Sequence, residues 1–180
     1  EFCQYFSLRG RRDRAFMLYS LVGGVPKYWE WLDVAAGGRP ADPLEAAERL
    51  YFSPLGWIEE EPRRVLADER MAGLGATSVL EAIGRGAHRS SEIAGRLGVS
   101  QTSLSKLLQV LLDAHLIVRE ISFGTSERDA KRTLYRIVDP ALRFWFSVYS
   151  PHRSRWTSYS REEKAELLAD HCGAVFEDWV

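Results

Sequence analysis

Residues Ser90–Glu120, "SSEIAGRLGVSQTSLSKLLQVLLDAHLIVRE", predict two short helices joined by a tight turn and followed by a strand. We expect Ser90 or Ser91 to cap the first helix. Gly98 is placed to end that helix, and Ser100 to cap the second. The second helix has leucines at the i, i+3, i+4, i+7 spacing of a buried face: Leu104, Leu107, Leu108 and Leu111.

The flanking segments complete a recognisable arrangement. Upstream, "TSVLEAIGRG" (77–86) has the apolar spacing of one more short helix. Downstream, "LIVREIS" (116–122) and "TLYRIVD" (133–139) are rich in β-branched and aromatic residues, as strands are, and the polar "FGTSERDAKR" (123–132) between them suits a hairpin tip. Three helices and a two-stranded hairpin predict a winged helix-turn-helix.

The chain before this segment reads as all helical. Pro26, Pro43 and Pro62 each stand where the first turn of a helix is expected, and Gly23-Gly24 ends the helix before Pro26. We therefore predict a mainly α protein, with a helical bundle followed by the winged helix-turn-helix.

The sequence divides into three expected domains. Residues 1–76 form the helical domain and residues 77–139 the winged helix. Residues 140–180 form an aromatic helical linker and the start of a C-terminal domain. Asp139-Pro140 is the main boundary, because a residue before proline resists helix and the second strand must end there.

The predicted second helix of the winged segment presents polar side chains opposite its leucines, as a helix in the DNA major groove does. These outward residues are Gln101, Thr102, Ser103, Lys106 and Gln109. The wing offers Arg128, Lys131 and Arg132 to phosphates, and Arg89 precedes the first helix of the pair. Double-stranded DNA is the partner that this pattern favours.

A protein-facing role stays open beside DNA binding. Residues 77–138 carry 9 basic and 6 acidic side chains, a modest excess for a dedicated DNA binder. Lys106 is the only charged residue on the expected reading face. Winged helices also act as contacts and switch elements within larger proteins.

Several functional classes are not expected from the residues themselves. The chain has no phosphate-cradling glycine loop followed by Lys and Ser or Thr, no nucleophile elbow and no zinc motif, so neither catalysis nor a bound cofactor or metal is predicted for it. No apolar run approaches the roughly 20 residues that cross a bilayer. Without a secretory leader, the expected setting is the cytoplasm, with Cys3 and Cys172 as reduced thiols.

Four stretches in order resemble a family of prokaryotic ATPases that is abundant in archaea: "LYSLVGGVPKYWEWL", "EEPRRVLADE", the winged segment and "YRIVDPALRFWFSVYSPHRS". The most specific pieces are Gly23–Tyr28, Tyr135–Pro140 and Leu142–Phe146. These ATPases join a P-loop core to a helical lid, a winged helix and a C-terminal nuclease-like domain of unknown function.

The resemblance implies that the helical domain of residues 1–76 is lid-like and that the chain is the middle of a longer protein. The ATPase core, with ATP and Mg²⁺, would precede Glu1, and most of the nuclease-like domain would follow Val180. Gly24 and Pro26 would then lie near the adenine, and Glu177 could match an acidic residue of the nuclease-like part. The same resemblance suggests the alternative to DNA binding: a winged helix that reports the nucleotide state to its own protein.

Overall fold

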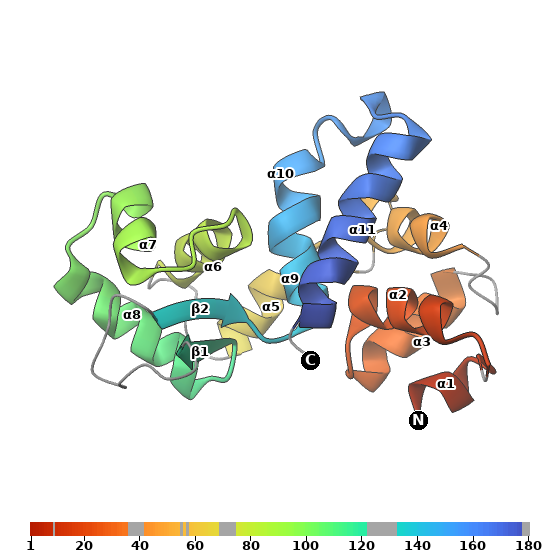
Figure 1. Cartoon of the computed structure of the whole chain (residues 1–180), viewed down its shortest axis with the longest axis horizontal. Helices are drawn as coiled ribbons and strands as arrows, with labels where there is room; N and C mark the ends of the chain where they lie inside the picture. Colours follow the sequence, from red (N-terminus) through yellow and green to blue (C-terminus); the bar gives the residue numbers. More distant parts are fainter. Residues whose placement is uncertain are drawn as a thin grey trace. The chain divides into compact units, whose positions relative to one another are not determined.

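The computed structural model describes residues 1–8, 10–35, 42–54, 56, 58–68, 75–121 and 133–177. The chain forms two compact units (Figure 1). The first, called the bundle here, contains Glu1–Glu61 and Asp139–Val180; the second, the winged unit, contains Pro62–Val138. The fold is mainly helical with a two-stranded antiparallel hairpin, as expected from the sequence.

The bundle is built from helices that precede and follow the winged unit in the chain, and the last of them (Arg161–Glu177) is the longest of those described. They are α1 (Phe2–Tyr5), α2 (Arg12–Val22), α3 (Pro26–Ala35), α4 (Pro43–Ala47), η1 (Glu48–Phe52), α9 (Pro140–Phe144), η3 (Trp145–Tyr149), α10 (Ser150–His152), η4 (Trp156–Ser158) and α11 (Arg161–Glu177). Asp42 caps α4 and Asp139 caps α9, each by accepting a backbone N–H at 2.9 Å. Both caps precede a proline at the first helical position, where no N–H is needed.

Residues after Asp139 share one hydrophobic core with the N-terminal helices. Leu18 and Leu21 of α2 are buried in the same cluster as Phe144 and Leu168. The hydroxyl group of Tyr51 donates to the carbonyl of Leu21 at 2.6 Å. The structure thus differs from the three-part division expected above, because the aromatic stretch after Pro140 fills the bundle core instead of linking domains.

Gly23 forms the tight corner between α2 and α3. Its φ is +62°, and a Cβ there would lie 3.0 Å from Cδ of Pro140 and 3.1 Å from Oδ2 of Asp139. Its carbonyl accepts a hydrogen bond from Nε1 of Trp29 at 2.9 Å. The corner therefore requires glycine both for its backbone conformation and for the close approach of α9.

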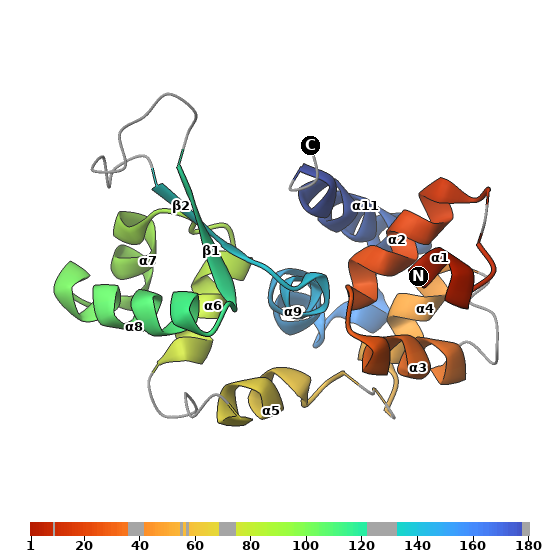
Figure 2. The ribbon, with the colours of Figure 1, turned by 90° about the horizontal axis from the view of Figure 1, so that it is seen from below.

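The winged unit has the predicted three helices and hairpin. Its elements are α6 (Ala76–Gly84), α7 (Ser90–Leu97), α8 (Gln101–Asp113), β1 (Ile117–Ile121) and β2 (Thr133–Ile137); α5 (Glu61–Asp68) leads into it from the bundle. Figure 2 shows α8 beside α7 and β1. The strands pair antiparallel with Ile117 opposite Ile137. The N–H of Tyr135 in β2 donates to the carbonyl of His88 at 2.8 Å, which ties the hairpin to the segment before α7.

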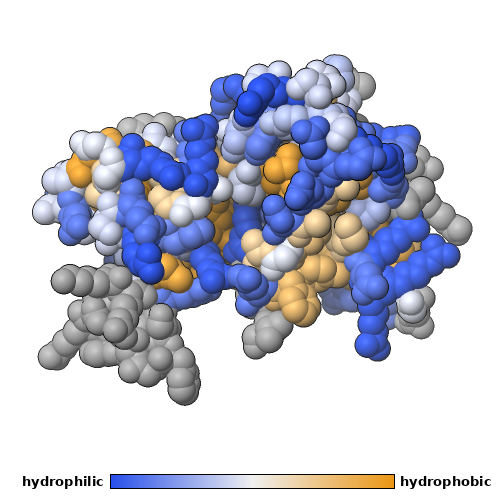
Figure 3. Space-filling view, turned by 45° about the horizontal axis from the view of Figure 1, so that its top comes forward, coloured by the Kyte–Doolittle hydropathy of each residue, from blue (hydrophilic) through white to orange (hydrophobic). Residues whose placement is uncertain are grey.

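Hydrophilic residues cover most of the described surface on the face that Figure 3 shows. None of the helices in the described ranges combines the length and the apolar character that a bilayer-spanning helix needs.

Candidate nucleic-acid interface

The turn between α7 and α8 follows the sequence prediction. Gly98 ends α7 in the left-handed conformation, with φ +65°. Ser100 caps α8 by accepting the N–H of Ser103 at 3.2 Å. The short turn fixes the direction in which α8 leaves α7.

The start of α7 differs from the prediction that Ser90 or Ser91 is its cap. Arg89 is the N-cap, and Ser90 is the first helical residue. The reason is Glu92, whose Oε2 accepts the backbone N–H groups of both His88 and Arg89 at 3.0 Å. A glutamate three residues after the cap satisfies donors that the helix leaves open, so its position sets where the helix begins.

The inward face of α8 is leucine, as predicted. Leu104, Leu108 and Leu111 are buried in the winged unit. Leu107 is only half-buried, since it faces Gly75, which has no side chain to cover it; a Cβ on Gly75 would lie 3.6 Å from Cδ1 of Leu107. This burial fixes the rotation of α8 about its axis, and with it the residues that point outward.

All five residues predicted to face outward on α8 are exposed: Gln101, Thr102, Ser103, Lys106 and Gln109. Two of them already bind neighbours on the same helix or its cap. Oγ of Ser103 lies 3.0 Å from Oγ of Ser100, and Nε2 of Gln109 donates to Oδ1 of Asp113 at 2.7 Å. The side chains of Gln101, Thr102 and Lys106 make no hydrogen bond or ion pair with any described residue. These three side chains are therefore accessible to a ligand without the loss of an existing contact.

Arg89 is exposed but engaged with Glu92. Its Nη1 lies 2.9 Å from Oε1 of Glu92 in a solvent-exposed pair. The backbone N–H of Arg89, and then its guanidinium, hold the pKa of Glu92 below its ordinary value. An exposed ion pair contributes little to stability. A phosphate that binds Arg89 would have to displace Glu92 from it, and the low stability of an exposed ion pair permits this.

The predicted wing contacts Arg128, Lys131 and Arg132 lie outside the described residues. In the part of the hairpin that is described, Nε of Arg136 lies 2.9 Å from Oε2 of Glu120 on the opposite strand. Glu120 thus neutralises the positive charge of Arg136 at the base of the hairpin. The structure thus brings together the α8 residues on one face and leaves the wing residues as a sequence prediction.

Gly24 and Pro26, which the family resemblance would place near adenine, are exposed at the α2–α3 corner of the bundle. Pro26 is the first residue of α3. Glu177, the last residue of α11, is also exposed. Their exposure is compatible with contacts to further domains, and their proposed roles stay predictions.

The titratable groups in the core of the bundle are packing residues. His171 of α11 donates from Nε2 to the carbonyl of Ser20 at 2.7 Å, and burial lowers its pKa to about 4. Sγ of Cys172 lies 3.0 Å from Oγ of Ser20, and burial raises the pKa of the Cys172 thiol. Within the described ranges, no three His, Cys, Asp or Glu side chains gather as a metal ion requires. These contacts hold α11 against α2.

One charged feature was missed in the sequence. Arg11, Arg12 and Arg14 line a pocket at the start of α2, together with Gly10 and Asp13. Three arginines within four residues, in "RRDR", were the available signal.

Comparisons with known proteins gave no match: no protein-family model, no curated protein and no solved structure resembles this chain closely enough to count.

Proposed function

We propose that the winged unit binds double-stranded DNA, with α8 in the major groove. The observation that carries the proposal is the outward face of α8, where Gln101, Thr102 and Lys106 are exposed and unengaged above a buried leucine stripe. Glutamine and lysine at the start of such a helix can hydrogen-bond to base edges, and Lys106 can also neutralise phosphate.

The family resemblance gives the wider setting of the proposal. In it, the bundle is the lid of a prokaryotic ATPase, and the P-loop core and the nuclease-like domain belong to the same cytoplasmic protein. ATP and Mg²⁺ are cofactors of that core, and the proposal gives this chain no catalytic role.

A salt titration with duplex DNA tests the proposal. Lys106→Ala should weaken binding and reduce the slope of log K against log salt by about 0.9, the value for one lost phosphate contact. Gln101→Ala should weaken binding with little change of slope, because it removes a neutral contact.

Lys27→Ala is the matched control for charge. Lys27 is an exposed lysine in the bundle, paired with Glu30 at 2.9 Å. Its replacement changes the net charge equally but should leave DNA affinity and salt slope unchanged. If Lys106→Ala behaves like Lys27→Ala, DNA does not bind through α8.

A second candidate function is an intramolecular or protein-protein switch that reports the nucleotide state. The observation in favour of this function is that two apolar side chains beside the same face are exposed to solvent. Val99 is 39% exposed and Val110 is 36% exposed. Apolar side chains beside polar ones suit a protein contact as well as a thymine methyl group. In a protein that includes the ATPase core, this function predicts that amides of α8 exchange hydrogen more slowly with ADP than with ATP. Equal exchange in both states would argue against it.

A further inference from the structure

The first turn of α8 carries two polar side chains without a hydrogen-bonding partner among the described residues. Gln101 and Thr102 are exposed at the first two helical positions. Ser103 differs from them, because its hydroxyl group lies 3.0 Å from that of the cap Ser100. Side chains on a helix lean toward its N-terminus, so residues at these two positions are directed toward the helix end that meets base edges.

The amide group of Gln101 matches one base edge in the major groove better than the others. It offers N–H donors and a carbonyl acceptor side by side. Adenine presents the complementary pair, an acceptor at N7 and a donor at N6, so glutamine can form two hydrogen bonds with it. Guanine presents two acceptors, N7 and O6, and would leave the glutamine oxygen facing another acceptor. Gln101 thus favours adenine.

Thr102 adds an apolar group beside this amide. Its exposed side chain carries a methyl group next to the hydroxyl group. Thymine presents a C5-methyl group in the major groove, and cytosine has only a hydrogen at the same place. Contact between the two methyl groups removes apolar surface from water, which is favourable. Thr102 therefore favours thymine.

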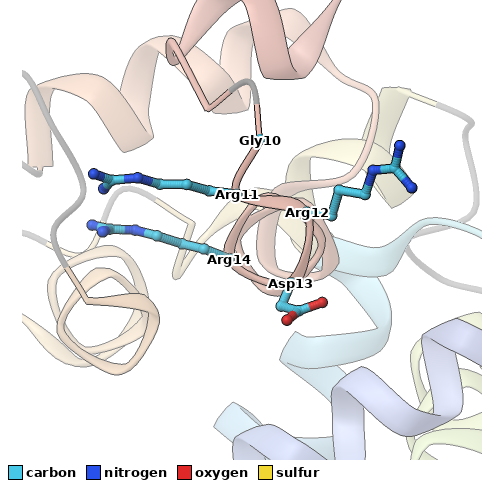
Figure 4. A pocket seen from close by; sticks show the side chains of 5 residues that line it. All are labelled: Gly10, Arg11, Arg12, Asp13 and Arg14. Atoms are coloured by element: carbon cyan, nitrogen blue, oxygen red, sulfur yellow. The ribbon is translucent and has the colours of Figure 1, made fainter.

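The side chain that most often binds guanine is absent from α8. Arginine matches N7 and O6 of guanine with its planar fork of donors, and α8 contains no arginine. Figure 4 shows three arginines at the start of α2, Arg11, Arg12 and Arg14, but α2 belongs to the bundle. Lys106 is the only cation of α8, and the proposed function uses its charge for a phosphate.

We infer that α8 prefers A·T base pairs, with Gln101 bound to adenine and Thr102 in contact with the methyl group of thymine. The inference rests on the proposed function, because both contacts need α8 in the major groove of duplex DNA. It adds the base preference of that site. The two residues are adjacent in one turn, so they reach the same or neighbouring base pairs.

Fluorescence anisotropy with three labelled duplexes of equal length tests the preference at one salt concentration. The first duplex alternates A·T pairs and the second alternates G·C pairs; in the third, hypoxanthine replaces guanine. Hypoxanthine lacks the N2 amino group, so its pair with cytosine has a major groove like G·C and a minor groove like A·T. The whole chain should bind the A·T duplex about tenfold more tightly than either of the others.

The three duplexes separate the possible failures. Equal binding of the hypoxanthine and A·T duplexes would overturn the inference, because the preference would then come from the minor groove. Equal binding of all three, with the loss of affinity expected for Lys106→Ala, would overturn it and leave DNA binding by α8 intact. Absence of binding to every duplex would end both this inference and the proposed function.

Two base analogues in the A·T duplex assign the preference to the two residues. With the parent chain, 7-deazaadenine, which lacks the N7 acceptor, should weaken binding about fivefold. Uracil in place of thymine removes the methyl group and should weaken binding about threefold. Gln101→Ala should abolish the first loss and keep the second. Thr102→Ser removes the methyl group but keeps the hydroxyl group, and it should do the reverse.

Gln4→Ala is the matched control for the loss of a glutamine. Gln4 is an exposed residue of α1 in the bundle, and its replacement should leave both losses as they are in the parent chain. The two α8 variants also control for each other, and thermal unfolding checks that each is folded. A folded Gln101→Ala chain that still discriminates against 7-deazaadenine, or two variants that each lose both discriminations, would show that these residues do not distinguish the bases.

Discussion

At the scale of single residues, Gly23 combines a positive φ with a close approach to Pro140. Gly23→Ala should lower the free energy of unfolding by about 1–3 kcal/mol, because alanine disfavours the left-handed conformation and its Cβ would press on Pro140. Urea unfolding followed by circular dichroism measures the change.

The neighbouring glycine provides the control. A Cβ on Gly24 would meet only Oη of Tyr19, at an ordinary contact distance of 3.6 Å. Gly24→Ala should therefore have a much smaller effect. Equal effects of the two replacements would contradict the tight corner.

His171 should make the bundle sensitive to acid. Burial lowers the pKa of His171 from 6.5 to about 4, so the folded state disfavours the protonated ring. The stability that the neutral ring contributes is present above pH 6.5 and is lost as the pH falls from 6.5 toward 4. At about 1.4 kcal/mol per pKa unit, the loss is on the order of 3 kcal/mol.

The measurement is the free energy of unfolding across that pH range. His171→Gln keeps a donor for the carbonyl of Ser20 but cannot be protonated, and it should flatten the dependence whatever its stability at neutral pH. His115→Asn, at an exposed position, should leave the dependence in place. A His171→Gln chain with the parent's pH profile would show that the buried ring is not responsible.

At the scale of elements, α8 offers a comparison between two adjacent leucines. Leu108→Ala should cost about 2–5 kcal/mol, since Leu108 is 3% exposed and its loss leaves a cavity. Leu107→Ala should cost clearly less, because Leu107 is half-buried opposite Gly75. Denaturant unfolding of both variants tests the rotation of α8 on which the proposed DNA face depends.

The elements of the winged unit could be predicted because their signals are local. The leucine spacing of α8, the glycine at the end of α7 and the serine before α8 all act within a few residues of each other. The outward face of α8 follows from the same spacing. Pairing of Arg89 with Glu92 was not predicted, since the sequence suggested serine caps that fit the pattern equally well.

The core of the bundle could not be predicted in the same way. Phe144 and Leu168 pack with Leu18 and Leu21, which lie on the other side of the winged unit in the sequence. The spacing of apolar residues within each segment does not indicate which other segment it packs against. The boundary predicted at Asp139-Pro140 does separate the two units, but the helix that begins at Pro140 returns to the bundle instead of opening a third domain.

At the scale of the whole molecule, the bundle is one compact unit made from two separate lengths of chain. Glu61 ends the first length and Asp139 begins the second. The Glu61 carboxylate is close enough to Asp139 to add to the effect of burial, which is the main reason that the pKa of Asp139 is raised. The two ends at which the winged unit is attached are thus neighbours on the bundle.

Because the two attachment points are neighbours, we expect the bundle to fold without the winged unit that is inserted between them. A short glycine-serine linker that joins Glu61 directly to Asp139 should yield a smaller protein that still melts cooperatively, because the bundle loses no core residue and closes a shorter loop. Thermal unfolding followed by circular dichroism measures this. A non-cooperative transition would mean that the bundle needs the winged unit in order to fold. Such an insertion site would allow a different domain to replace the winged unit while the sequence of the bundle stays the same.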